Sequence, residues 1–172
     1  LEKQLRFDGY DVNRVMNITD VGHLASDADE GEDKMLTGAK REHKSVLEIA
    51  QFYTDAFFSD CAKLNIKTPD VVQPATGLID EYIQIVSGLM EKGYAYLTGG
   101  NVYFDTAKLE RYYVFNDHNE EDLAVGVREG VEADSNKRNR NDFVLWFTKS
   151  KFEDQALKWD SPWGVGYPGW HI

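Results

Sequence analysis

The segment from Val12 to Ile18 constrains the fold of this chain more than any other. It is rich in β-branched and apolar residues, and it is bounded by Gly9 and by the polar residues that follow Asp20. A run this short and this apolar is typical of a buried strand in a parallel sheet. The helical spacing of the residues before Gly9 places a helix ahead of this strand.

Two amphipathic helices are predicted between residues 45 and 93. Ser45 with Glu48 three positions later forms a capping box, which marks the start of a helix of about five turns. Apolar residues then recur with the helical period at Val46, Ile49, Tyr53, Phe57 and Leu64. The second helix is marked by Ile79, Tyr82, Ile83, Val86 and Met90, and Gly93 is expected to close it as a C-terminal cap.

The pattern changes after residue 93. Two short aromatic and β-branched runs flank Gly99 and Gly100, which predicts a β-hairpin. Residues 105–141 are polar and show little periodicity, so we expect an irregular, exposed insertion that includes the basic cluster "NKRNRN". The run "DFVLWF" then indicates a further strand or the start of a compact packing segment.

Composition and charge narrow the class of protein. The 172 residues suffice for one domain with a small insertion, and 42% hydrophobic with 28% charged residues is ordinary for a globular chain. No apolar run approaches the roughly 20 residues of a membrane span, and no signal peptide opens the chain, which predicts an intracellular protein. The net charge of −11 repels polyphosphates, so a nucleic-acid partner requires a local basic patch or a separate domain.

Several motifs carry weak signals. Gly164, Gly166 and Gly169 spell G-x-G-x-x-G, but no helix or acidic residue follows as a dinucleotide site requires, so these glycines are expected to let the backbone pass close to aromatic rings or a small ligand. The acidic run from Asp27 to Asp33 fails the EF-hand template and is interpreted as a solvated face. His23, His43 and His118 are surface histidines by default, and "NKRNR" is either solvated or a phosphate contact.

Two short segments are better placed for binding a ligand. "NITD" follows the predicted strand directly, so Asn17, Thr19 and Asp20 lie where ligands of parallel sheets bind, unless Asn17 and Asp20 merely satisfy the turn and cap the next segment. In the terminal "GWHI", Trp170 and His171 either line a pocket or pack against the sheet.

Five stretches of the chain together resemble cysteinyl-tRNA synthetase, a class I aminoacyl-tRNA synthetase. In order, they are "GYDVNRVMNITDVGHL", "DADEGEDKM", "EKGYAYLTGGNVYFD", "NKRNRNDFVLWF" and "KWDSPWGVGYPGWHI". The resemblance covers nearly the whole chain, is most specific in the last stretch and is weakest between Arg111 and Ala133.

This resemblance implies an α/β fold: part of a Rossmann-type catalytic domain with a small α+β connective insertion. Residues 1–93 would belong to the catalytic domain, 94–158 to the insertion with its hairpin, and 159–172 to a return loop that contributes to the substrate pocket. The implied activity is the ATP- and magnesium-dependent activation of cysteine and its transfer to tRNA(Cys) in the cytoplasm, with zinc as a cofactor.

The resemblance also implies site residues. Thr19, Trp170 and His171 match the family's cysteine pocket. No catalytic residue and no metal ligand is assigned within the chain, since the family's zinc cysteines and its "HIGH" and "KMSKS" motifs belong before Leu1 or after Ile172. Cys61, the single cysteine, matches none of the zinc ligands and excludes an internal disulfide.

Both ends therefore suggest a piece of a longer protein. Alone, the 172 residues are expected to bind zinc weakly or not at all, to form no adenylate and to self-associate through an exposed apolar edge at Val15 and Ile18. Two other functions stay open on the sequence: a related ligase that activates cysteine for a different acceptor, and a binding module without catalysis on the same scaffold.

Overall fold

The computed structural model describes residues 1–20, 40–41, 44–111, 135–149 and 157–169. The described residues form two compact units, the first ending at Leu78 and the second beginning at Ile79. The first unit contains α1 (Glu2–Phe7), β1 (Val15–Ile18), α3 (Val46–Lys63), β2 (Val71–Pro74) and the 3-10 helix η1 (Ala75–Leu78). The second contains α4 (Ile79–Glu91), β3 (Ala95–Thr98), β4 (Asn101–Phe104), η2 (Thr106–Lys108), β5 (Phe143–Phe147) and β6 (Tyr167–Pro168).

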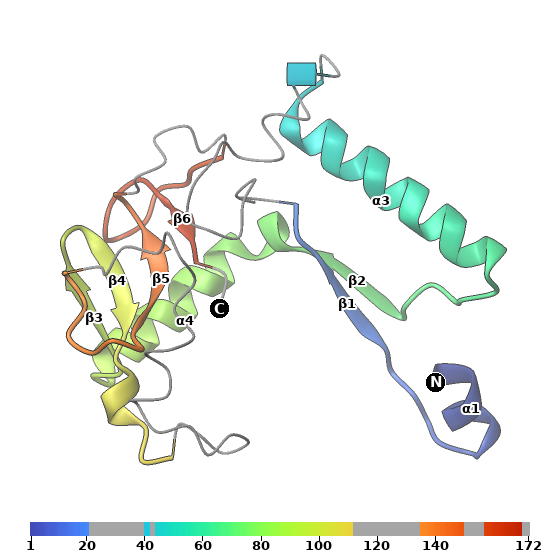
Figure 1. Ribbon diagram of the computed structural model, residues 1–172, viewed down its shortest axis with the longest axis horizontal. Helices are drawn as coiled ribbons and strands as arrows, with labels where there is room; N and C mark the ends of the chain where they lie inside the picture. The colour runs from blue at the N-terminus through green and yellow to red at the C-terminus, as the bar shows by residue number, and fades with distance from the viewer. Residues whose placement is uncertain (21–39, 42–43, 112–134, 150–156, 170–172) are drawn as a thin grey trace. The chain divides into compact units, whose positions relative to one another are not determined.

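The predicted parallel strand is confirmed, although it is not buried. β1 pairs with β2 in parallel, with Val15 opposite Val71 and Ile18 opposite Pro74 (Figure 1). Val15 is 63% exposed and Ile18 is half-buried, so the expectation of a buried strand is wrong. Within the described residues β2 is the only strand that pairs with β1, which leaves the other side of β1 without a neighbour. The exposure of Val15 agrees with the expected open edge.

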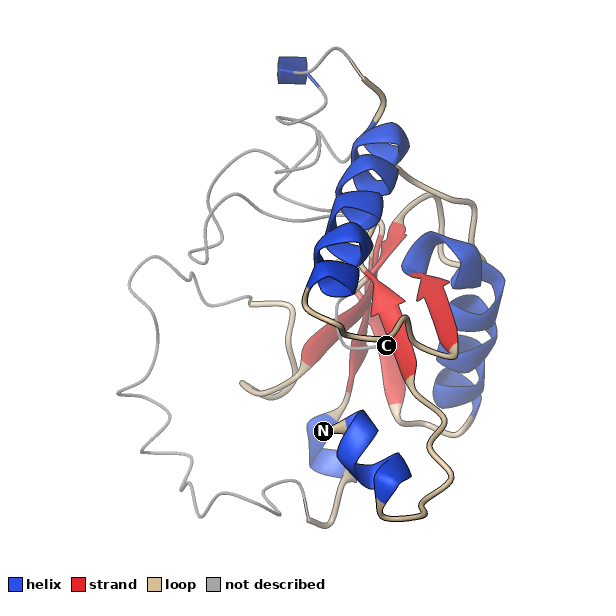
Figure 2. Cartoon of the chain, turned by 90° about the vertical axis from the view of Figure 1, so that its right-hand side faces the viewer, coloured by secondary structure: helices blue, strands red, loops and turns tan. Residues whose placement is uncertain are grey.

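The long helix forms where the capping box places it. Ser45 Oγ accepts a hydrogen bond from the Glu48 backbone N–H, and the Glu48 carboxylate accepts one from the Ser45 N–H, at 3.2 and 2.7 Å. The bond from the Ser45 N–H to the carboxylate is the main reason why the pKa of Glu48 is lowered. α3, labelled in Figure 1 and drawn as a long blue helix in Figure 2, is continuous. It spans 18 residues and ends in a Schellman motif, in which Asn65 adopts φ +57° and Ile66 N–H donates to Cys61 C=O at 2.9 Å.

The helix α4 also ends in a Schellman motif, at the glycine that the sequence predicted. Gly93 has φ +76°, its N–H donates to Met90 C=O at 3.0 Å, and Tyr94 N–H donates to Leu89 C=O at 2.9 Å. This bonding satisfies the last carbonyl groups of the helix. The chain then turns directly into β3, on which α4 packs.

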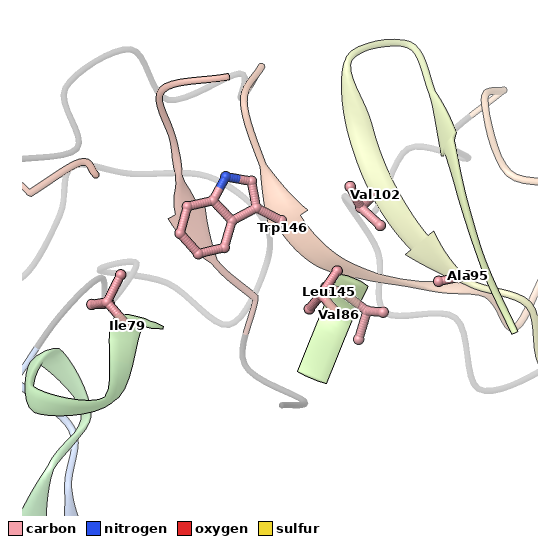
Figure 3. Close-up of a cluster of buried hydrophobic side chains, with 6 residues drawn as sticks. All are labelled: Ile79, Val86, Ala95, Val102, Leu145 and Trp146. Atoms are coloured by element: carbon pink, nitrogen blue, oxygen red, sulfur yellow. The ribbon is translucent and has the colours of Figure 1, made fainter. Parts of the chain in front are cut away.

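The second unit is a four-stranded antiparallel sheet in the order β3-β4-β5-β6. Gly99 and Gly100 both have positive φ and form the two-residue turn between β3 and β4, as predicted. "DFVLWF" forms β5, which also confirms the prediction of a strand there. The core lies between α4 and the sheet (Figure 3) and consists of Ile79, Val86, Ala95, Val102, Leu145 and Trp146.

The expectation of an exposed insertion fails where the described part of residues 105–141 meets the sheet. Asp105 and Thr106 are buried, because their polar atoms take part in a hydrogen-bond network with the segment before β5. The structure groups α4 with the sheet, whereas the division into residues 1–93, 94–158 and 159–172 stays a prediction.

Candidate functional site

The carboxyl ends of the two parallel strands form the candidate site. β1 ends at Ile18 and is followed by Thr19 and Asp20, while β2 ends at Pro74 and is followed closely by Thr76. Ile18 and Pro74 are register partners, so both chain segments leave the sheet at the same edge. In open parallel sheets, ligands bind beyond this edge.

Asp20 links the two strand ends. Its Oδ1 accepts a hydrogen bond from the Thr76 backbone N–H at 2.9 Å, and its Oδ2 accepts one from the Thr76 hydroxyl. Asp20 is only 6% exposed. Thr76 lies at the start of η1, where backbone N–H groups have no acceptor within the helix. The carboxylate therefore caps η1 and fixes the residues that follow β1.

This role was not predicted from the sequence. Within the described residues, both carboxylate oxygens of Asp20 are engaged by Thr76, and the segment that directly follows Asp20 lies outside these residues. Its partner Thr76 lies 56 positions along the chain. Only the parallel pairing of β1 with β2 brings these two residues together.

Thr19 lies half-buried beside this link. Its Oγ1 accepts a hydrogen bond from Asn17 Nδ2 at 3.3 Å, so Asn17 contributes to the local turn and orients Thr19. A hydroxyl group can donate one hydrogen bond and accept two. Among the described residues, no acceptor engages the Thr19 hydroxyl proton, which leaves it able to bind a carboxylate or carbonyl oxygen.

The terminal glycine-rich segment packs on β5. Trp159 and Gly166 exchange backbone hydrogen bonds at 2.7 and 2.9 Å, and Gly169 N–H donates to Leu145 C=O at 2.8 Å. A Cβ atom on Gly166 would lie 1.9 Å from the Phe147 carbonyl oxygen and 2.8 Å from the Trp146 indole nitrogen. A Cβ on Gly169 would lie 2.0 Å from the backbone oxygen of Val144.

Gly166 and Gly169 therefore permit a close backbone approach, whereas a Cβ on Gly164 would make only ordinary contacts with Thr148. The Trp146 ring beside Gly166 fits the predicted aromatic partner, but the main partner is the backbone of β5, which was not predicted. Trp170 and His171 follow Gly169 directly and lie outside the described residues. Thr19 is thus the one predicted pocket residue whose surroundings are seen.

Comparison with known proteins places this arrangement in a family. The family described as tRNA synthetases class I (C) catalytic domain matches residues 1–172. The chain belongs to this family. Its α/β architecture, expected from the sequence, is that of a class I synthetase catalytic domain.

Individual relatives agree with this membership. Over 172 residues, the chain is 58% identical to the cysteine–tRNA ligase of Treponema denticola and 50% identical to that of Borrelia hermsii. It is 50% identical over 175 residues to the cysteine–tRNA ligase of Treponema pallidum. All of this chain is covered, but it spans only 34% to 36% of the length of these relatives.

A buried polar network in the second unit of this synthetase chain escaped the sequence analysis. Asp142, 1% exposed, accepts hydrogen bonds from the Tyr96 hydroxyl at 2.6 Å and from the Thr106 N–H and hydroxyl at 2.9 Å. Asn139 N–H donates to the same carboxylate at 2.9 Å. An aspartate directly before an apolar strand was the available signal, but its partners lie far away in sequence.

The network shifts two pKa values in opposite directions. Burial raises the pKa of Asp142, but the hydrogen bonds from Tyr96, Thr106 and Asn139 outweigh burial and lower it overall. Burial is also the main reason why the pKa of Tyr96 rises to about 12, and the neighbouring Asp142 carboxylate adds to the shift. Both groups keep their ordinary charge at neutral pH.

The basic cluster is partly engaged in the same network. The Arg138 guanidinium lies 4.1 Å from the centre of the Tyr96 ring and 3.7 Å from Asp105 Oδ2. Arg138 N–H donates to the Tyr96 hydroxyl oxygen at 2.8 Å. Arg138 therefore has a structural role, which the sequence did not predict.

No metal site forms within the described part of this synthetase chain. No three histidine, cysteine, aspartate or glutamate side chains gather there. Cys61 lies half-buried in α3. All four histidines and the acidic run from Asp27 to Asp33 lie outside the described residues. None of the helices in the described ranges combines the length and apolar character needed to cross a membrane.

Proposed function

We propose that this chain works as part of a cysteine–tRNA ligase, which activates cysteine with ATP and transfers it to tRNA(Cys). The observation that carries the proposal is the identity of 50% to 58% across every residue of the chain to proteins that bear this name. The match covers the whole chain, so the matched region contains the strand ends where the substrate would bind.

Within this activity, Thr19, Trp170 and His171 are assigned to the cysteine pocket. The support for Thr19 is its place after a parallel strand and its hydroxyl proton, which is free to bind the amino-acid carboxylate. Asp20 supports it indirectly, because a buried carboxylate with two hydrogen bonds to Thr76 holds the backbone beside Thr19 in place. For Trp170 and His171, the support is their match to the family pocket.

ATP with magnesium and zinc are the cofactors that the family implies. The described residues gather no set of side chains that fits zinc. The part assigned to this chain is to orient the amino acid and to exclude water around it. Translation takes place in the cytoplasm, and we assign the protein to that compartment.

The test is a cysteine-dependent pyrophosphate exchange assay on the purified full-length protein, followed by charging of tRNA(Cys). Exchange with cysteine and not with serine, together with cysteinyl-tRNA formation, is the expected result. Exchange without any charging of tRNA would instead favour a ligase with a different acceptor. A protein that binds cysteine or tRNA without exchange would be the non-catalytic module.

A further inference from the structure

We propose that Lys137, Arg140 and Lys149 form an RNA-phosphate-binding surface on the second unit, here called the basic patch. The chain carries a net charge of −11, so a polyanion can approach only where cations gather locally. Arg140 and Lys149 are exposed and Lys137 is half-buried. Among the described residues, none of the three side chains has an ion-pair partner.

Hydrogen bonds to the buried residues Tyr96, Asp142 and Asp105 hold the segment that carries Lys137 and Arg140 in place. Arg138 N–H donates to the Tyr96 hydroxyl oxygen at 2.8 Å, and Asn139 N–H donates to Asp142 Oδ2 at 2.9 Å. The Asn139 side chain also donates to Asp105 Oδ1 at 3.0 Å. Such anchoring lowers the conformational entropy that the patch would lose on binding.

Lys149 is held at the turn of the hairpin formed by β3 and β4. Its N–H donates to the Asn101 side-chain oxygen at 2.9 Å, and its methylene groups lie 3.0 to 3.2 Å from where a Cβ on Gly100 would be. Asn136 packs against the adjacent Gly99. Lys137 and Lys149 therefore emerge at the same end of the hairpin.

The neighbouring acidic groups do not cancel this charge at the surface. Asp142 and Asp105 are 1% and 5% exposed, and their oxygens are engaged by Tyr96, Thr106, Asn139 and Arg138. Arg138 lies 3.7 Å from Asp105 Oδ2, so among the described residues neither Asp105 nor Asp142 pairs with a patch cation. Lys137 and Arg140 thus have a role that Arg138, their neighbour in the cluster, does not share.

The spacing of the cations favours a nucleic-acid backbone over a single phosphate ion. Arg140 precedes β5 and Lys149 follows it, so a five-residue strand of roughly 17 Å separates them along the sheet. One inorganic phosphate cannot contact both, whereas successive backbone phosphates can. The choice of tRNA as the RNA rests on the proposed function.

The test compares two triple variants of the full-length protein with equal loss of charge. One is Lys137→Gln/Arg140→Gln/Lys149→Gln, and the control is Lys63→Gln/Lys67→Gln/Lys92→Gln, which removes exposed lysines elsewhere. The dissociation constant for tRNA is measured between about 50 and about 200 mM salt. The patch variant should bind about tenfold more weakly at low salt, with a salt slope smaller by about one per cation removed.

An unchanged slope, or an equal loss in the control variant, would overturn the proposal. Cysteine-dependent pyrophosphate exchange without tRNA should stay at the wild-type level in the patch variant. Loss of pyrophosphate exchange in the patch variant would also count against the proposal, because the three side chains would then be stabilising the fold. The single variant Arg140→Gln repeats the test at one exposed position. Absence of exchange in the wild-type protein would instead refute the proposed function, while the salt slope still tests the patch.

Discussion

The Tyr96 hydroxyl donates to Asp142 Oδ2 at 2.6 Å, although 46 positions separate the two residues in the sequence. The same hydroxyl oxygen accepts the Arg138 N–H, while Asp142 Oδ1 accepts two hydrogen bonds from Thr106. The pair thereby holds the segment before β5 against the hairpin. The stability of the second unit should depend on it.

Tyr96→Phe is expected to lower the free energy of unfolding of the second unit by about 2 kcal/mol, because it leaves the Arg138 N–H and the Asp142 carboxylate each short of a partner. Urea unfolding followed by tryptophan fluorescence measures this, since the described tryptophans Trp146, Trp159 and Trp163 lie in that unit. Tyr94→Phe is the control, because Tyr94 is 37% exposed and should change stability by less than about 0.5 kcal/mol. Equal effects of both substitutions would contradict the role of Tyr96.

The stability of the second unit should fall at both extremes of pH. The pKa of Asp142 lies below the 3.8 of an unperturbed aspartate, so its contribution is present above pH 3.8 and is lost as the pH falls through the lower folded value. The pKa of Tyr96 is raised from 10.0 to about 12, so its contribution is full below pH 10.0 and is lost as the pH rises towards about 12. Urea midpoints across both windows test this, and Tyr96→Phe should remove the alkaline part that Tyr96 causes.

Gly166→Ala should destabilise the second unit by several kcal/mol, because the added Cβ would meet the Phe147 carbonyl oxygen at 1.9 Å. Gly88→Ala is the matched control. Gly88 lies within α4 with no atom within 4 Å of the added carbon, so alanine should stabilise the helix by about 1 kcal/mol. Thermal unfolding of both variants tests the difference, and a Gly166 variant as stable as the wild type would refute the close packing on β5.

Asp20→Ala should accelerate hydrogen exchange at the Thr76 amide by about tenfold or more, because it removes the acceptor of that N–H and with it about 1.4 kcal/mol or more of local protection. Amides in the middle of α3 serve as an internal reference and should keep their rates. Unchanged exchange at Thr76 would mean that the link between the two strand ends contributes no stability.

Thr19→Val should raise the KM for cysteine in pyrophosphate exchange by about tenfold in the full-length protein, because the substrate carboxylate would lose a hydrogen-bond donor. Thr19→Ser keeps the hydroxyl and should behave like the wild type. If valine and serine give the same KM, Thr19 serves only the turn that it forms with Asn17.

The candidate site could be predicted only in part. The position of Thr19 after a strand followed from the apolar run before it, since ligands of parallel sheets bind at strand ends. The Asp20–Thr76 link could not be predicted, because its two residues lie 56 positions apart and no periodic pattern relates them. Trp170 and His171 stay predictions based on the resemblance.

The sequence by itself determined the features that depend on neighbouring residues. Ser45 and Glu48 set the start of α3, Gly93 set the end of α4, and the Gly99-Gly100 pair set the hairpin, because capping and positive φ are local properties of the chain. The tertiary structure alone decided which polar groups are buried. Nothing in the sequence marks Asp142 or Asp20 as buried, and each becomes a buried anchor because strand pairing brings it distant hydrogen-bond donors that compensate for the loss of water.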